Sequence, residues 1–392
     1  MKVCVICSTF PPQRSGQKCG IGDYTIHLSR GLVSLGFEIV ILTSTLYTGP
    51  RVLDPNLAVF PLIRNWNTAA LKVVRSFLDV QRCSLVSLQY QPNMYGKRWS
   101  FFNALLPIVT KSQSRKLVTT FHSIANPSPV SPTRLSALLL AACSDHIIVT
   151  NEHHLSELLR LYGPAARKLS CVPVGANILP SDKLWGRREH VRIGVRARLG
   201  ISQDEVLLSH FGLIYQGKGL ETLLKAMRLL LDSGRDVRLL IFGHVRPTAE
   251  SYCKSLAMFA EKLGIEDHII WTRDCTENEI SEYLLASDIY VVPYDDGISS
   301  RRGSSMVGFA HGLPIVSTSS PTIPPIFKSG QNVILVPPKD GTALFRALVE
   351  LVDSAERRTA IGIASLQLAQ QFSWPLISRA IADVCSQVAD RR

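Results

Sequence analysis

The sequence predicts an α/β protein made of two successive domains, each with a parallel sheet covered by helices on both faces. The chain has 392 residues, about twice the length of a usual single domain. Short apolar runs rich in Val, Ile and Leu alternate with longer amphipathic stretches, as buried parallel strands alternate with helices. The alternation stops once, between Asn177 and Gly200, and then begins again.

In the first half, the pattern predicts a series of strands separated by helices. The strands are expected at Lys2–Ser8, Glu38–Thr43, Leu85–Gln89, Lys116–Phe121, His146–Thr150 and Leu169–Val174. Helices are expected from Asp23 to Gly36, at Thr68–Val80 and at His153–Leu161. Asp23 is the expected N-cap of the first helix and Gly36 its expected C-cap. Cys4 and Cys7 have CxxC spacing within the first strand, where they would point to opposite faces, so we expect no metal or redox pair.

The stretch Asn177–Gly200 contains Pro180 and the pair Arg187-Arg188 but no long apolar run, so we expect the domain linker there. This gives an N-terminal domain over residues 1–184 and a C-terminal domain over 185–374, followed by a terminal helix. The elements expected after the linker are strands at Val206–Phe211, Val237–Phe242, His268–Trp271, Ile289–Val292 and Pro314–Ser317, and helices at Leu220–Leu231, Ala249–Leu263, Glu277–Ala286, Ser304–His311 and Trp374–Ala389.

The charge is unevenly distributed along the chain. Residues 1–184 hold 19 Lys/Arg and 8 Asp/Glu, whereas residues 185–392 hold 24 and 23. A basic half indicates an anionic partner, such as a phosphorylated acceptor or an anionic membrane surface, or simply a solvated basic surface. No nucleic-acid partner is expected, because aromatic and basic residues do not interleave into a binding platform. No apolar run approaches the roughly 18 residues that span a bilayer, so we expect a cytoplasmic protein, peripheral at most on the inner membrane face.

The loop after the first predicted strand contains Gly20-Ile21-Gly22-Asp23-Tyr24, and its glycines are expected just before a helix. Backbone N–H groups at such a helix start attract anions or hydroxyl oxygens. A dinucleotide fingerprint would need a third glycine where Thr25 stands. It would also need an acid at the end of the second strand, which is Thr43-Ser44, so an oxidoreductase is not expected.

His122 ends another predicted strand, and Gln89-Tyr90 ends the strand before it. Ligands of doubly wound sheets bind at the carboxyl ends of strands. A histidine there could hydrogen-bond a sugar hydroxyl or a phosphate, although a purely structural histidine is the alternative.

Two loops in the second half combine positive charge with glycine or serine at a helix start. The first runs from Gly212 to Lys218-Gly219, and the second contains Arg301, Arg302, Ser304 and Ser305. An ammonium or a guanidinium beside free backbone N–H groups suits a diphosphate. Asp295-Asp296 leaves a magnesium site open as an alternative, but no HExxH or clustered Asp and His appears, so we expect no metal and no cofactor.

These motifs together resemble the family 4 glycosyltransferases, also called group 1. The resemblance rests on Pro11-Pro12 with Gly20-Ile21-Gly22, on Thr120-Phe121-His122, on Val172–Asn177, on Lys218-Gly219 and on Phe372-Ser373-Trp374. It covers nearly the whole chain, and the order of the motifs is more specific than any one of them.

The resemblance implies the GT-B fold: two Rossmann-like, doubly wound domains facing across a cleft, with a C-terminal helix, 375–392, that returns to the first domain. It implies a hexosyltransferase that moves sugar from a UDP- or GDP-sugar, or an ADP-sugar, to a glycan, lipid-linked or other acceptor. Transfer would retain configuration and need no metal, in the biosynthesis of a polysaccharide or glycolipid.

The resemblance also assigns roles to individual residues. His122 and Lys218 are the implied catalytic residues. The implied donor-binding residues are Gly212, Lys218, Gly219, His244, Ser299, Arg301, Arg302, Ser304 and Ser305. The implied acceptor and cleft residues are Gly20, Ile21, Gly22, Asp23, Tyr24, Gln89 and Tyr90.

The sequence departs from the family pattern at three positions. Leu213 stands where the family has an arginine, and Ser299 and Val307 stand where it has two glutamates. We therefore expect Arg301 or Arg302 to replace the lost arginine at the diphosphate. The alternatives are a nucleotide-sugar epimerase of the same fold, which would need carboxylates for acid–base work, and a degenerate sugar-nucleotide-binding or scaffold protein.

Overall fold

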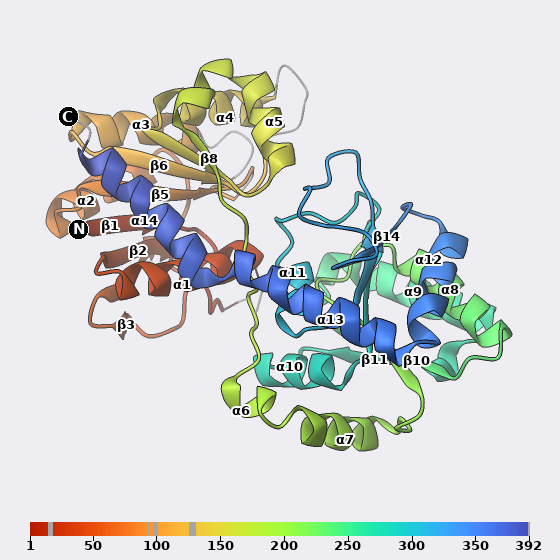
Figure 1. Ribbon diagram of the computed structural model, residues 1–392. Helices are drawn as coiled ribbons and strands as arrows, with labels where there is room; N and C mark the ends of the chain where they lie inside the picture. Colours follow the sequence, from red (N-terminus) through yellow and green to blue (C-terminus); the bar gives the residue numbers. More distant parts are fainter. Residues whose placement is uncertain (15–18, 93, 97–100, 125–130, 391–392) are drawn as a thin grey trace. The chain divides into compact units, whose positions relative to one another are not determined.

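The computed structural model describes residues 1–14, 19–92, 94–96, 101–124 and 131–390. Its contacts divide the chain into two compact units, Met1–Gly175 with Ser373–Arg392, and Ala176–Phe372. The first unit thus ends nine residues before the boundary expected at 184, because Ala176 and Ile178 pack into a core of the second unit. Each unit is a doubly wound α/β domain (Figure 1).

The first unit contains an eight-stranded sheet in the order β3-β4-β2-β1-β5-β6-β7-β8, parallel except where β3 pairs with β4. Its strands are β1 (Lys2–Ile6), β2 (Glu38–Ser44), β3 (Val52–Asp54), β4 (Leu57–Ile63), β5 (Leu85–Tyr90), β6 (Lys116–Phe121), β7 (His146–Val149) and β8 (Leu169–Cys171). Its helices are α1 (Gly20–Ser34), α2 (Ala70–Gln81), α3 (Phe102–Ser112), α4 (Pro132–Cys143), α5 (Glu152–Leu161), the short η1 (Gly163–Lys168) and α14 (Trp374–Asp390).

Side chains of β1 alternate between two cores, one on each face of the sheet. Val3 and Val5 pack with α1 and α14, whereas Cys4 and Ile6 pack with α2, α3 and α4. Cys7 follows the strand and lies in the first of these cores, so the two cysteines do face opposite sides. The terminal helix α14 fits closely on α1: Trp374 stacks on His27, with ring centroids 5.0 Å apart.

The second unit contains six parallel strands in the order β11-β10-β9-β12-β13-β14. They are β9 (Val206–Phe211), β10 (Val237–Gly243), β11 (Ile269–Arg273), β12 (Ile289–Val292), β13 (Ile315–Thr318) and β14 (Ile334–Val336). The helices are α6 (Asp182–Trp185), α7 (Arg188–Leu199), α8 (Leu220–Asp232), α9 (Glu250–Leu263), α10 (Glu277–Ala286), α11 (Gly303–Ala310), α12 (Gly341–Val352) and α13 (Ala355–Ala369), with the short η2 (Pro247–Ala249), η3 (Glu266–His268) and η4 (Gln370–Phe372).

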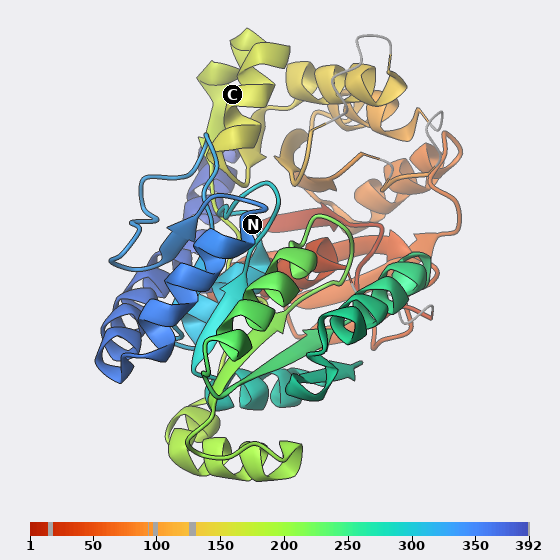
Figure 2. The same ribbon diagram turned by 90° about the vertical axis from the view of Figure 1, so that its right-hand side faces the viewer.

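Helices cover both faces of this second sheet. The core on one face joins α8, α9 and α12, which lie in front in the view of Figure 2. The core on the other face joins α7, α10, α11 and α13. All strands and helices expected for this unit are present, and β14, α6, α7, α12 and α13 are additional. In the described residues no helix is both long enough and apolar enough to span a bilayer.

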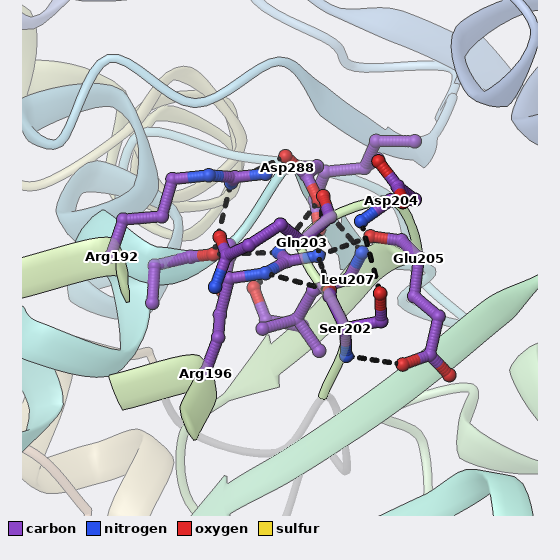
Figure 3. Close-up of polar contacts among 12 residues, drawn as sticks. Arg192, Arg196, Ser202, Gln203, Asp204, Glu205, Leu207 and Asp288 are labelled. Carbon is purple, nitrogen blue, oxygen red and sulfur yellow. Dashed lines mark hydrogen bonds and ion pairs between the residues drawn. The ribbon is translucent and has the colours of Figure 1, made fainter. Parts of the chain in front are cut away.

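The expected linker stretch Asn177–Gly200 instead contains a twelve-residue helix, α7, which belongs to the second unit. Arg196 of this helix is fully buried, and its guanidinium donates to the carbonyl oxygen of Ser202 at 2.7 Å and to Asp288 at 3.1 Å. Arg192 reaches the same carboxylate at 2.7 Å (Figure 3). The helix is thus held by buried charge and hydrogen bonds in addition to a few apolar contacts. A search for apolar periodicity therefore does not predict it.

Candidate functional site

Loops at the carboxyl ends of three neighbouring strands of the second unit, β9, β10 and β12, meet backbone to backbone. A Cβ on Gly243, after β10, would lie 2.0 Å from the carbonyl oxygen of Gly212, after β9. A Cβ on Gly219 would lie 1.8 Å from the carbonyl oxygen of Pro293, after β12. Because such distances exclude any side chain, glycine at both positions lets the three loops pack against one another.

Lys218 is buried within this loop cluster. It is 5% exposed, and its Nζ lies 4.9 Å from the ring centroid of Tyr294 and 5.0 Å from that of Tyr215. Nζ would lie 3.7 Å from a Cβ on Gly212, so the ammonium sits beside the strand end. Burial, with a smaller effect from the nearby charge of Arg302, lowers the pKa of Lys218 to about 7.

Arg302 shares the Tyr294 ring with Lys218. Its guanidinium carbon lies 4.0 Å from the ring centroid, a cation–π distance. Arg302 and Arg301 both donate to the carboxylate of Asp296, Arg301 at 2.9 Å. The two arginines thus share one carboxylate, and Lys218 adds a third basic group on the Tyr294 ring, so the excess of basic groups suits an anion.

Two buried polar atoms in the same loop have no hydrogen-bond partner among the described residues: Nε of Arg302 and Oγ of Ser299. A buried polar atom without a partner is costly. A ligand with several acceptor oxygens would supply a partner for the guanidinium. The loop that carries Arg301 and Arg302, which we expect to replace the missing arginine, can therefore still donate a hydrogen bond to a ligand.

Ser304 and Ser305 at the start of α11 hold Tyr294 in place. Their hydroxyls lie 3.0 and 3.1 Å from the Tyr294 hydroxyl. The Cβ of Ser304 would contact a Cβ on Gly212 at 3.4 Å. The structure thus brings together Gly212, Gly219, Lys218, Arg301, Arg302, Ser304 and Ser305. Tyr294 and Asp296 also belong to this site, and the sequence reasoning gave them no role in anion binding.

His244 lies at the end of β10, and its backbone carbonyl accepts from Ile214 N–H at 3.1 Å. Its Nδ1 is 3.0 Å from a carboxylate oxygen of Asp274. His244 therefore borders the loop cluster through its backbone, while its side chain faces an acidic group. Val307, at the second missing glutamate, is fully buried in the apolar core.

The first unit brings His122 and Gln89 together at the ends of two neighbouring strands. The Nε2 of His122 lies 2.9 Å from Oε1 of Gln89, and Gln89 donates to Ser87 at 3.2 Å. With the amide oriented this way, Nε2 carries the proton and Nδ1 is left as an acceptor. Burial lowers the pKa of His122 to about 3, with a smaller effect from His154, so the imidazole is neutral at pH 7.

Tyr24 packs against His122, with ring centroids 4.8 Å apart and the rings edge to face. Its hydroxyl is buried without a hydrogen-bond partner in the described part of the chain. Tyr90 points the other way, into the core shared with α2 and α3, and its hydroxyl lies 3.5 Å from the carbonyl oxygen of Thr133. Because neighbouring residues of a strand face opposite sides of the sheet, only Gln89 of the expected pair reaches His122.

The expected N-cap at Asp23 is wrong. Helix α1 begins at Gly20 after the cap residue Cys19, and Asp23 lies within its first turn. Gly20, Ile21 and Gly22 are therefore helical rather than part of the loop, whose residues 15–18 lie outside the described ones. Gly36, with φ +87°, follows the C-cap residue Leu35, as the predicted helix end requires.

The two glycines of this turn have different surroundings. A Cβ on Gly22 would lie 2.4 Å from the carbonyl oxygen of Thr9, whereas a Cβ on Gly20 would meet none of the described residues within 4 Å. Gly22 thus lets α1 pack closely against the chain that follows β1, while Gly20 leaves open space at the start of the helix. Ile21 is buried in the core beneath α1.

Within the described residues, no group of three or more His, Cys, Asp or Glu side chains could hold a metal ion. Of the acidic pair considered as a magnesium site, Asp296 is occupied by Arg301 and Arg302, and Asp295 lies 3.7 Å from Lys339. Both carboxylates are thus placed to neutralise cations of this chain.

Solved structures show which fold class the two units form. Sucrose-phosphate synthase from Thermosynechococcus elongatus superposes with a TM-score of 0.77 at 16% identity, over 98% of each chain. HepE from Anabaena, in complex with UDP and glucose, superposes with a TM-score of 0.75 at 14% identity, over 99% of this chain and 100% of that one. The fold is GT-B, built from two Rossmann-like domains.

Two family models match consecutive parts of the sequence. The one for "Glycosyltransferase Family 4" matches residues 19–178, and the one for "Glycosyl transferases group 1" matches residues 205–354. Together they cover more than half of the chain, which belongs to the family 4 (group 1) glycosyltransferases and is an enzyme of that type. The D-inositol 3-phosphate glycosyltransferase of Streptomyces coelicolor is 24% identical over 94% of this chain and 87% of that protein. The counterpart from Xylanimonas cellulosilytica is 25% identical over 96% and 94%.

Proposed function

We propose that this glycosyltransferase moves a hexosyl group, with retention of configuration, from a nucleotide-diphosphate sugar to a glycan or lipid-linked acceptor. The donor is a UDP- or GDP-sugar whose diphosphate binds beside Lys218. The observation that carries the proposal is the buried Lys218 beside Arg301 and Arg302, whose two guanidinium groups share the carboxylate of Asp296. HepE, which shares the fold, was crystallised with UDP and with UDP-glucose, and this supports the same class of donor.

The leaving diphosphate has to be stabilised by positive charge. As the donor's bond between the anomeric carbon of the sugar and the phosphate oxygen breaks, negative charge develops on that oxygen. Fixed cations in a site with little water stabilise this charge. Lys218 and the guanidinium of Arg302 are held on one tyrosine ring, so they need little rearrangement. We propose that these cations balance the diphosphate without an essential metal ion.

His122 is proposed to contact the sugar or acceptor through a neutral hydrogen bond. Its lowered pKa makes it a poor phosphate-binding cation, but its unprotonated Nδ1 accepts from a hydroxyl. Gln89 holds the ring in that tautomer. The first unit is the proposed acceptor side. A phosphorylated or lipid-linked acceptor in the cytoplasm, at the inner membrane face, matches its net positive charge, and the relatives named above act on an inositol phosphate by name.

The test is calorimetric titration of the purified protein with UDP, GDP and ADP, followed by a screen of the corresponding sugars for nucleotide release. We expect saturable binding of one nucleotide and its release only when an acceptor is added. No binding at millimolar concentration would overturn the donor site and favour a scaffold. Conversion of the donor sugar without any transfer would instead indicate an epimerase.

The double variant Arg301→Ala, Arg302→Ala tests the part that the arginines play. Losing charge-assisted hydrogen bonds of about 1.5–3 kcal/mol predicts at least a tenfold weaker affinity for the nucleotide. Arg346→Ala, at an exposed arginine on α12, is the matched control. Undiminished affinity in the double variant would show that the arginines do not contact the diphosphate.

A further inference from the structure

A shallow apolar groove lies on the first unit between β4 and α2. It encloses about 540 Å³ and is lined mainly by carbon, from Phe60, Leu62, Val73, Phe77 and Val80. Three of these side chains are strongly exposed: Val80 at 76%, Leu62 at 45% and Val73 at 39%. Aliphatic groups gathered in one exposed groove indicate a surface that another apolar phase covers.

Helix α2 carries two apolar stripes. One stripe, with Val74, Phe77 and Leu78, packs into the core beneath the helix. The other stripe lies on the exposed side of the helix, where Val73 and Val80 are two helical turns apart. Folding of the unit accounts for the first stripe but not for the second, which faces solvent beside Lys72 and Arg75.

The neighbouring helix α3 also carries exposed apolar residues. It packs against α2 in the same layer, as Figure 1 shows, and Gln113 at its end donates to Asp79 of α2 at 2.7 Å. Its exposed residues include Ile108 at 62% and Leu105 at 36%, followed by the exposed Lys111. We call the exposed residues Leu62, Lys72, Val73, Arg75, Val80, Leu105, Ile108 and Lys111 the α2–α3 face.

The segment that carries this face is almost free of negative charge. Residues 55–144 contain ten Lys or Arg and one acidic residue, Asp79. The carboxylate of Asp79 lies 2.7 Å from the guanidinium of Arg115, so its charge is compensated within the fold. The excess basicity of the first unit is therefore concentrated in residues 55–144, and Lys72, Arg75 and Lys111 place part of it on α2 and α3.

We propose that the α2–α3 face docks on an anionic lipid bilayer. Aliphatic side chains enter the boundary between headgroups and acyl chains, while long Lys and Arg side chains reach the lipid phosphates. A bilayer offers uniform negative charge over the whole face, whereas a protein partner would need acidic groups matched to each scattered cation. The inference adds a place of action to the proposed function, and its lipid-linked acceptor would then lie in the same membrane.

The experiment is sedimentation of the full-length protein with phosphatidylcholine vesicles, with and without phosphatidylglycerol. We expect binding only to the vesicles that contain phosphatidylglycerol, and less of it as salt is added. Lys72→Glu with Arg75→Glu should weaken that binding about tenfold or more, because each cation near an anionic surface contributes about a factor of five. Val73→Ser with Val80→Ser should also weaken vesicle binding relative to the wild type. This loss should be greater at high salt, where the apolar contribution dominates.

Lys254→Glu with Lys262→Glu, at exposed positions of α9 in the second unit, is the matched control and should bind vesicles as the wild type does. Each variant is also titrated with nucleotide, and unchanged affinity shows that the donor unit is intact. Equal binding with and without phosphatidylglycerol, no binding at all, or wild-type binding by the Lys72 and Arg75 variant would overturn the proposal. If no vesicles are bound at all, an acidic protein becomes the partner to test. Failure of the donor site would appear only in the nucleotide titration.

Discussion

The two sites at the strand ends of this protein are built from similar parts, but one carries positive charge and the other is neutral. In the second unit, Lys218 lies among arginines and needs an anion to balance it. In the first unit, burial lowers the pKa of His122 and keeps it neutral beside Gln89, with no ion pair between these two residues. A glycosyltransferase has to bind a charged diphosphate and an uncharged hydroxyl, and under the proposed function one fold repeated twice would meet both needs.

The sharpest test of this division is Lys218→Ala. Removing a buried cation from the place where charge develops should lower kcat/KM about 10²–10³-fold. It should also weaken nucleotide binding about tenfold or more. Lys262→Ala, at an exposed lysine of α9, should leave both unchanged. Steady-state kinetics and calorimetry measure the two quantities, and unaltered kinetics of the Lys218 variant would break the comparison.

His122→Ala should separate the two sites. Loss of one positioned hydrogen bond predicts a fall in kcat/KM of about 10–100-fold, while nucleotide affinity stays at the wild-type value because the other unit holds the diphosphate. His122→Asn keeps a polar group and should recover part of the activity. Weaker nucleotide binding in the alanine variant would contradict the assignment of His122 to the sugar or acceptor.

The pH dependence of donor binding should follow Lys218 and not His122. The pKa of Lys218 is lowered to about 7, so the free enzyme loses this charge as pH rises above 7. A bound diphosphate favours the charged form and raises that pKa. Affinity for UDP-glucose should therefore fall above pH 7, by at most tenfold per pH unit, with uptake of a proton on binding. Calorimetry in buffers of different ionisation enthalpy measures the uptake, and Lys218→Met should abolish it.

The smallest expected effects concern the two glycines at the start of α1. Gly22→Ala places a Cβ 2.4 Å from a backbone oxygen and should cost about 1–3 kcal/mol of unfolding free energy. Gly20→Ala meets open space and should change stability by no more than about 0.5 kcal/mol. Denaturant unfolding checks both, and equal stability of the variants would show that the close approach is easily relieved.

The apolar pattern was sufficient to predict most elements of both sheets but missed those held by other forces. Strands β9 and β12 have the expected bounds because both are short and largely apolar, and helix α10 has them because Ile280, Tyr283 and Leu284 recur at helical spacing. Strand β4 was missed because Pro61 lies within it, and proline normally argues against a strand. Helix α7 was missed because its most buried side chain is Arg196, whose carboxylate partner Asp288 is far away in the sequence.

The candidate site was predictable as a set of loops but not as an arrangement of atoms. Loop position after a strand was enough to propose Lys218, Arg302 and His122. Tyr294, which lies under both cations, and Asp296, which joins both arginines, could not be recognised, because these contacts depend on how the loop 294–302 folds on itself and against Lys218. Tyr90 could have been excluded beforehand, since it alternates with Gln89 along one strand.

The contact between the loops after β9, β10 and β12 has a consequence for how this enzyme could evolve. The peptide groups of Gly212, Gly219 and Gly243 and the Pro293 carbonyl leave no volume for a side chain. Substitution at Gly219 or Gly243 would push the strands apart before it altered a ligand contact. Divergence toward a new donor is therefore confined to side chains around the margin, such as Tyr215, Ser299 and Arg301. This tightly packed backbone would let descendants change their sugar nucleotide without rebuilding the proposed phosphate site.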